Sequence, residues 1–295
     1  MNTLVSELYT EIRFNIKRES SGFGDSLILS RINWSIEALA DLFNLDEMRE
    51  LVMGTIKSYK TGTVTATATG SLIDSTAPFG VWNVGNIVHN GTTKERIIIT
   101  ANSDSSTNLA ALTFTIGDTY TIYNNMIVLP TDFKMSQRLM IHDGTTQIEV
   151  DRKMRESFNQ AISNPTLLGR PYMFTYDQIE DYFEVYKNPT QDYLYDLYYY
   201  KYPAKLTAGT DRLPFKRMDR IIMAFATVFC FYSLQEWDLG DKWTQITNGL
   251  MQQFLEKEKN KYSDIVFEAK GFLRGIHSRF LNTEPASDPT VKYWN

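Results

Sequence analysis

The sequence has very few of the residues on which disulfide scaffolds and metal sites depend: of 295 residues, one is cysteine and three are histidine. A single cysteine excludes a disulfide within the chain and fits a reducing compartment. Because Cys230 directly follows the apolar run at residues 221–229, we expect a small buried side chain and not a nucleophile. None of His89, His142 and His277 has a second ligand at metal-binding spacing, so we expect no metal and no other cofactor.

An excess of positive charge is also missing, since 30 Lys and Arg stand against 35 Asp and Glu, a formal net charge of −5. Tight binding to a phosphate backbone needs clustered positive charge, so this composition argues against it. The longest apolar stretch, at residues 221–232, is far shorter than the ~20 residues that span a bilayer. Residues 1–8 lack the features of a signal peptide. We expect a soluble protein, made in the cytosol, with no membrane partner.

Sequence motifs of enzymes are missing as well. Residues 21–25 hold two glycines before a predicted helix but lack a Gly-Lys-Ser/Thr ending, so they are interpreted as a helix-entry loop. Residues 102–106 lack the glycine and the distal glutamate of a calcium loop. Adjacent carboxylates such as Asp46 and Glu47 do not face each other on a helix, although two distant carboxylates could still meet across a cleft. We expect a protein that is not an enzyme.

Helical periodicity is present at the amino-terminal end. A first helix is predicted from an apolar residue at every fourth position: Leu4, Leu8, Ile12 and Ile16. After a glycine-containing break, Asp25 or Ser26 is predicted to cap a second helix. Its apolar face is expected to hold Leu29, Ile32, Ile36, Leu39 and Phe43. Residues 45–58 are predicted to add another helical stretch.

The period changes to two at Thr61, where β-branched residues alternate with small ones as far as residue 70. Short strands are predicted to follow at residues 84–89, 96–101, 110–116 and 120–123. This spacing is typical of a small antiparallel barrel. Residues 61–130 are therefore predicted to be a β module inserted into a helical protein.

Two hairpins are predicted in the second half of the chain. The first covers residues 140–150 around the turn Asp143-Gly144, and residues 151–163 are predicted to be helical after it. The second is rich in tyrosine: residues 182–186 form one strand, residues 188–191 the turn, and residues 193–202 the return strand.

The carboxyl-terminal part is predicted to be helical again. A long apolar helix is expected at residues 217–237 and a turn at residues 239–241. An amphipathic helix should follow, carrying Trp243, Ile246, Leu250 and Phe254. Prolines and small polar residues then predict an extended tail at residues 281–295.

The predicted fold class is α+β: a helical bundle core with an inserted small antiparallel β-barrel-like module, a Tyr-rich β-hairpin and an extended C-terminal tail. Four segments are expected: residues 1–60, the amino-terminal helical part of the core; residues 61–130, the β module; residues 131–280, the hairpins and helices that complete the core; and residues 281–295, the tail.

Aromatic residues are the most promising interface candidates. The tyrosines of the return strand could stack bases, but their strand context and the neighbouring Asp192 and Asp196 favour sheet packing or a subunit contact. The expected subunit or tail interface consists of Tyr195, Tyr198, Tyr199 and Tyr200. Aromatics on the polar tail indicate either a peptide that orders on a partner or a frayed terminus. Its candidate contact residues are Pro285, Pro289, Tyr293 and Trp294.

Several short motifs occur in a distinctive order. They are Arg31-Ile32-Asn33-Trp34-Ser35-Ile36-Glu37-Ala38-Leu39, Tyr120-Thr121-Ile122-Tyr123, Leu129-Pro130-Thr131-Asp132-Phe133, Gly169-Arg170-Pro171-Tyr172, residues 198–206, and Asp211-Arg212-Leu213-Pro214. In this order they resemble the head-to-tail adaptor proteins of tailed bacteriophages, the head-completion or tail-accessory connectors. The resemblance covers residues 1–260, with Ser35 where the family has Ala, and the chain departs from it in its length past residue 260.

The resemblance implies a structural virion protein, synthesised in the host cytoplasm and located at the head–tail junction. Such adaptors form a ring of twelve copies beneath the portal protein, extend the DNA ejection channel and dock a tail protein or the next ring. Genomic double-stranded DNA would pass through the lumen without sequence-specific binding. The resemblance also implies that residues 283–295 reach along the portal.

Two other classes of function stay open. A carbohydrate-binding or cell-wall-degrading module of a phage would use Trp82 and the Tyr-rich hairpin as a sugar platform. A single-stranded-DNA-binding protein would need salt-dependent binding, which the net charge gives no reason to expect.

Overall fold

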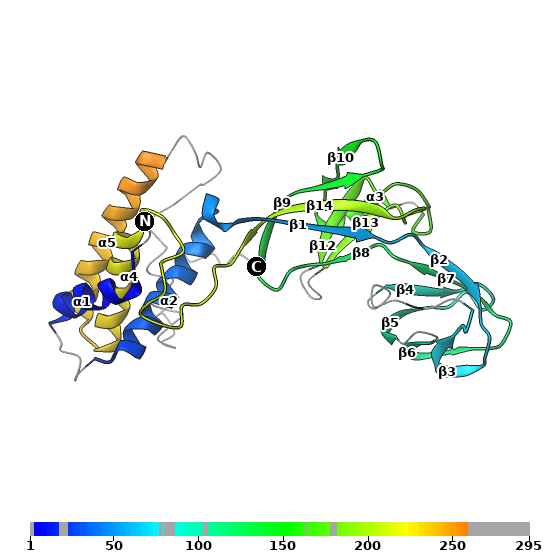
Figure 1. The fold of residues 1–295 in the computed structure, drawn as a ribbon, viewed down its shortest axis with the longest axis horizontal. Coiled ribbons are helices and arrows are strands. Elements are labelled where there is room, and N and C mark those ends of the chain that lie inside the picture. The colour runs from blue at the N-terminus through cyan, green and yellow to red at the C-terminus, as the bar shows by residue number, and fades with distance from the viewer. Residues whose placement is uncertain are drawn as a thin grey trace, which may run out of the picture. The chain divides into compact units, whose positions relative to one another are not determined.

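The computed structural model describes residues 3–17, 23–76, 79, 86–102, 106–162, 164–177 and 182–258. The chain divides into two compact units, one of Met1–Met48 with Tyr202–Asn295 and the other of Arg49–Lys201. The described part of the first unit is helical and that of the second consists mainly of antiparallel sheets (Figure 1). The predicted α+β class is confirmed at this level.

The helical unit is built around one apolar helix. Its helices are α1 (Val5–Ile16), α2 (Asp25–Leu42), α4 (Asp219–Ser233) and α5 (Trp237–Glu258). Helix α4 contacts each of the other three, and its Ile222, Phe225 and Phe229 are buried. A helix that is apolar on nearly every side has to be surrounded, which explains its central place. The helices predicted around these positions are confirmed.

The start of α2 differs from the prediction. Gly24 is the N-cap residue and no side chain bonds the free backbone N–H groups, so capping by Asp25 or Ser26 is wrong. Asp25 instead forms an ion pair with Arg13 of α1. The buried face of α2 holds Ile28, whereas Leu29 is only partly buried.

The predicted turn at residues 239–241 is wrong, because these residues lie inside α5. The chain turns earlier, where Leu234 N–H donates to the carbonyl of Cys230. The absence of a side chain at Gly240 lets α5 pack closely against Tyr232 of α4, because a Cβ at this position would collide with the ring of Tyr232.

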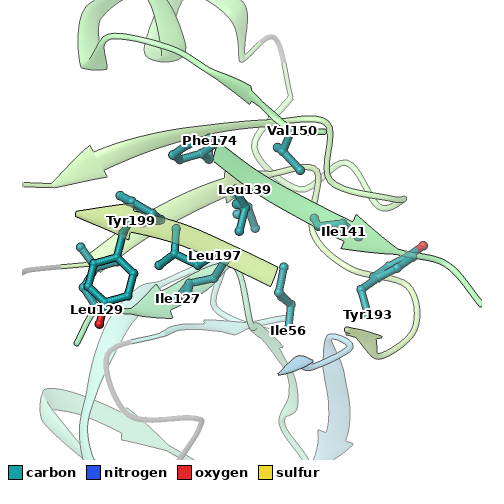
Figure 2. Close-up of a cluster of buried hydrophobic side chains, with 12 residues drawn as sticks. Ile56, Ile127, Leu129, Leu139, Ile141, Val150, Phe174, Tyr193, Leu197 and Tyr199 are labelled. Atoms are coloured by element: carbon teal, nitrogen blue, oxygen red, sulfur yellow. The ribbon is translucent and has the colours of Figure 1, made fainter. Parts of the chain in front are cut away.

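Two four-stranded sheets share one core in the second unit. The first sheet has the order β1 (Arg49–Ile56), β14 (Tyr193–Lys201), β9 (Phe133–His142) and β10 (Gln147–Glu149). The second has the order β11 (Asp151–Arg152), β12 (Met173–Asp177), β13 (Tyr182–Tyr186) and β8 (Met126–Val128). Figure 2 shows their buried side chains, among them Leu139 and Leu197 of the first sheet and Phe174 of the second. The short helix α3 (Arg155–Ala161) packs Phe158 against Met173.

Residues 45–58 do not form the predicted helix. A three-residue 3-10 helix, η1 (Asp46–Met48), is followed directly by β1, which pairs with β14 from Arg49 opposite Tyr200 to Ile56 opposite Tyr193. Pairing along all eight residues of β1 supplies backbone hydrogen bonds and buries Ile56, so tertiary context overrides the local helical pattern.

The predicted Tyr-rich hairpin is also wrong, although both of its strands exist. Strand β13 pairs with β12 and β8, whereas β14 pairs with β1 and β9, so the two strands belong to different sheets. Phe183 and Val185 from β13 and Leu197 and Tyr199 from β14 lie in the same core. The strands meet face to face across the core instead of edge to edge.

The third sheet occupies residues 60–123 and contains six strands. Its order is β2 (Lys60–Thr63), β7 (Thr119–Tyr123), β4 (Ile87–Asn90), β5 (Arg96–Asn102), β6 (Ser106–Phe114) and β3 (Ala68–Ile73). Among the described residues it does not close into a barrel, because β2 and β3 are its two edges. A corner at residues 64–67 joins these edge strands, and Val64 and Tyr120 are buried in the sheet's own core.

The first predicted hairpin is confirmed, with β9 and β10 paired on either side of Asp143-Gly144. Helix is found in only part of residues 151–163, at α3. Trp82 and the predicted tail at residues 281–295 lie outside the described residues.

Candidate interaction surface

The first sheet presents apolar side chains on the face that points away from its core. Side chains alternate along a strand, so residues 194, 196 and 198 of β14 point to the side opposite the buried Tyr193, Leu197 and Tyr199. On this face Met53 is 74% exposed, Leu194 61% and Leu51 40%. We call these three residues, together with Met140 and Tyr198, the outer face.

Strand register places the outer-face residues in adjacent rows. Leu51 lies opposite Tyr198 and Met53 opposite Asp196, while Asp196 lies opposite Met140 on the other side. Leu194 is paired with Thr55 of β1 and with His142 of β9. The apolar residues therefore lie on three adjacent strands around Asp196, which stands between Met53 and Met140.

Polar side chains on the same face of the sheet interact with their neighbours through hydrogen bonds and a cation–π contact. His142 Nε2 lies 2.9 Å from Asp196 Oδ2, and Gln147 Nε2 donates to the same oxygen at 3.2 Å. The guanidinium of Arg138 lies 4.1 Å from the ring centroid of Tyr198. These contacts hold the polar side chains beside the apolar area.

The four candidate interface tyrosines occupy different environments. Tyr195 packs against the core, and Tyr199 is buried in it with its hydroxyl donating to Asp132 Oδ1 at 3.0 Å. Burial, together with this hydrogen bond, raises the pKa of Tyr199 to about 12. The hydroxyl of Tyr200 accepts a hydrogen bond from Arg49 Nε at 3.4 Å, and Tyr200 is only 8% exposed.

Tyr198 is thus the candidate tyrosine on the outer face that remains partly exposed. An interface role for all four tyrosines stays a prediction. Pro285, Pro289, Tyr293 and Trp294 lie outside the described residues.

The outer face was not predicted from the sequence, because Leu51 and Met53 fell in a predicted helix. Leu51, Val52 and Met53 are consecutive apolar residues, so no alternation in the sequence could have revealed it.

The histidines and the cysteine, which are the residues considered as metal ligands or as a nucleophile, do not form a common site in the described part of the chain. Within the ranges that the structure describes, no group of three or more His, Cys, Asp and Glu side chains could hold a metal ion. His89 packs edge-on against Tyr123, and His277 is outside those ranges. Cys230 is buried as expected, and burial raises the pKa of its thiol to about 12. None of the helices searched, all from the described part of the chain, is long and apolar enough to span a membrane.

No protein-family model and no curated protein matches this chain.

Proposed function

We propose that the protein is a structural subunit of a phage particle, a head-to-tail adaptor that forms a ring beneath the portal. The ring, of twelve copies by the resemblance described above, extends the DNA channel and docks tail components. The helical unit then serves as a bundle core, and the third sheet, which lies within the predicted residues 61–130 except for Lys60, as the inserted barrel-like module. Residues 281–295 would be an extended tail on the portal.

The observation that carries the proposal is the exposed apolar outer face. Monomeric proteins rarely leave a continuous apolar area in water unless a partner covers it. Here Leu51, Met53 and Leu194 are 40%, 74% and 61% exposed. They lie at three successive same-face positions of the paired strands β1 and β14. A protein whose function is assembly has a reason to keep such an area.

A closed ring requires each subunit to use two different surfaces, one for each neighbour. The outer face supplies one such surface. Contacts repeated around a ring reinforce one another, so each can be modest by itself. A net charge of −5 also suits a channel wall along which DNA slides, since strong phosphate binding would hold the DNA back.

The experiment is to mix the purified protein with its cognate portal and to image the complex by electron microscopy. The expected result is a ring of this protein added to the portal. A persistent monomer that ignores the portal and pulls down with peptidoglycan would contradict the proposal and favour the carbohydrate-binding alternative.

A matched pair of variants tests the role of the outer face. Leu194→Asp should reduce addition to the portal at least tenfold, because an exposed apolar side chain is then replaced by a second carboxylate beside Asp196. Val128→Asp is the control: Val128 is 76% exposed but lies on β8, in the other sheet of the same unit. Equal losses in both variants would show that the outer face has no special role.

A further inference from the structure

Strand β1 is an edge strand and is longer than the usual strand of about five or six residues. It runs for eight residues and pairs with β14 on one side, while no strand of the described ranges pairs with its other side. Long apolar edge strands invite pairing with another chain, and proteins usually guard them with lysine, proline or a bulge. From Leu51 to Ile56 strand β1 has none of these, and its pairing with β14 is regular throughout.

We propose that two copies of this protein pair through β1, antiparallel and about a two-fold axis at Val52. The two first sheets would then join into one continuous eight-stranded sheet. This contact closes at two copies and does not rest on the proposed ring, which needs two different surfaces. A second copy suits this edge because, in the register centred on Val52, apolar residues of β1 face apolar residues and no like charges oppose each other.

The choice of register follows from side-chain direction. Residues directly opposite each other in a sheet point to the same face, and the odd-numbered residues of β1 lie on the same side of the sheet as the outer face. Only registers that pair odd with odd residues keep both buried faces on one side. Among these, the register centred on Val52 pairs Leu51 of each copy with Met53 of the other.

The positions of the charged residues Arg49 and Glu50 also favour this register. Glu50 would lie opposite Gly54 of the second copy and Arg49 opposite Thr55, so no like charges oppose each other. Shifting the centre to Leu51 would set Arg49 opposite Met53, and shifting it to Met53 would set Glu50 opposite Ile56. The Val52 register pairs apolar with apolar residues and leaves both charges beside small or polar ones.

Cysteine cross-linking tests the axis directly. In Val52→Cys the two new thiols would lie directly opposite each other, within reach of a disulfide, so oxidation should give a covalent dimer in high yield. Thr55→Cys is the control, since two residues 55 would be about 20 Å apart in this register. The natural Cys230 is buried and does not interfere.

Charge exchange tests the register by light scattering across micromolar to millimolar concentrations. Met53→Lys and Leu51→Glu should each weaken self-association at least tenfold. Mixing the two variants should restore a dimer, because the ammonium introduced at position 53 of one copy then faces the carboxylate introduced at position 51 of the other. Met154→Lys, at an 82% exposed methionine outside β1, should associate like the unaltered protein.

A monomer at every concentration, a dimer that Val52→Cys fails to cross-link, or equal cross-linking of Thr55→Cys would overturn the proposal. The ring is tested separately by portal binding. If the protein forms rings on the portal but Val52→Cys does not cross-link, only the β1 pairing is refuted. If Val52→Cys cross-links but the protein does not bind the portal, only the adaptor function is refuted.

Discussion

Tyr195 of β14 lies with its ring over Gly54, the residue directly opposite it on β1. A Cβ built on Gly54 would lie 2.5 Å from the hydroxyl oxygen of Tyr195. The third sheet repeats the arrangement, since Gly62 of β2 lies opposite Tyr120 of β7, and a Cβ there would be 2.5 Å from the Tyr120 hydroxyl. In both cases an aromatic ring covers a glycine on an edge strand and replaces the packing that the glycine lacks.

The first prediction is that Gly54→Ala destabilises the protein. The added methyl group must displace the ring of Tyr195, and overpacking of this kind costs about 1–3 kcal/mol. Urea unfolding followed by circular dichroism measures the change. Gly249→Ala is the control: a Cβ at this position in α5 meets nothing within 4 Å, so it should stabilise the helix by about 0.5–1 kcal/mol. A Gly54→Ala protein as stable as the unaltered one would show that the ring moves freely.

The second prediction concerns Tyr120, whose hydroxyl donates to Asp74 Oδ2 at 2.8 Å with both residues buried. Tyr120→Phe removes the donor and leaves a buried carboxylate oxygen with one partner fewer. Loss of such a hydrogen bond costs about 1–3 kcal/mol. Thermal unfolding at neutral pH measures it, and Tyr172→Phe, at a 45% exposed tyrosine, should change little.

The third prediction is the acid dependence of this contact. Burial raises the pKa of Asp74, but hydrogen bonds from Thr76 and Tyr120 and the charge of Lys60 outweigh it and hold the pKa below its ordinary value. The native carboxyl is thus harder to protonate than the unfolded one. Its contribution to stability is complete above the ordinary pKa of ~3.9 and is lost as the pH falls through the lowered native value.

Asp74→Asn should therefore flatten the acid limb of the stability profile. The free energy of unfolding of the unaltered protein should fall more steeply than that of the variant as the pH drops below ~4, measured by urea titration at each pH. Parallel profiles for the two proteins would show that Asp74 titrates alike in the folded and unfolded states.

Local periodicity was enough to predict α1, α2, α4 and α5 and most strands of the third sheet. It failed where the pairing partner decides the structure. Leu51, Val52 and Met53 are consecutive apolar residues, which suit a helix as well as a strand, and only pairing with β14 makes them β1. Because Leu51 and Met53 face solvent, the strand also lacks the polar alternation by which a strand is usually recognised.

The failed hairpin has a different cause. Strands β13 and β14 each alternate correctly, but alternation shows which side chains share a face and not which strand lies alongside. The connection at residues 187–192 is bound to two separate parts of the chain. Asn188 bonds the loop at residues 164–169, while Asp192 accepts from Ser58 N–H at 2.9 Å. These anchors carry the chain from one sheet to the facing one.

The fourth prediction uses the buried thiol of Cys230. Burial raises its pKa to about 12, so almost no thiolate exists at neutral pH, and the native protein should not react with a disulfide reagent such as DTNB. In urea one thiol per chain should react rapidly. Rapid reaction of one thiol in the native protein would mean that α4 opens readily.

The fifth prediction concerns Asn188, which is 2% exposed and anchors the connection between β13 and β14. Its side-chain Nδ2 donates to the carbonyl of Pro165 at 2.8 Å, and its backbone N–H donates to the carbonyl of Leu167 at 3.0 Å. Asn188→Ala keeps the backbone bond but removes the side-chain donor. It should cost about 1–3 kcal/mol, measured by urea unfolding.

Gln191→Ala provides the control for this loop, because Gln191 is exposed in the same connection and its loss should stay within about 0.5 kcal/mol. Hydrogen exchange gives a second readout. In Asn188→Ala the amides of Asn188 and Gly169, which bond across the two loops, should exchange faster, while those in the β1–β14 ladder should not change. If both variants lose equal stability, or if exchange rises throughout the unit, then Asn188 does not hold this connection in place and the two sheets are joined mainly by their common core.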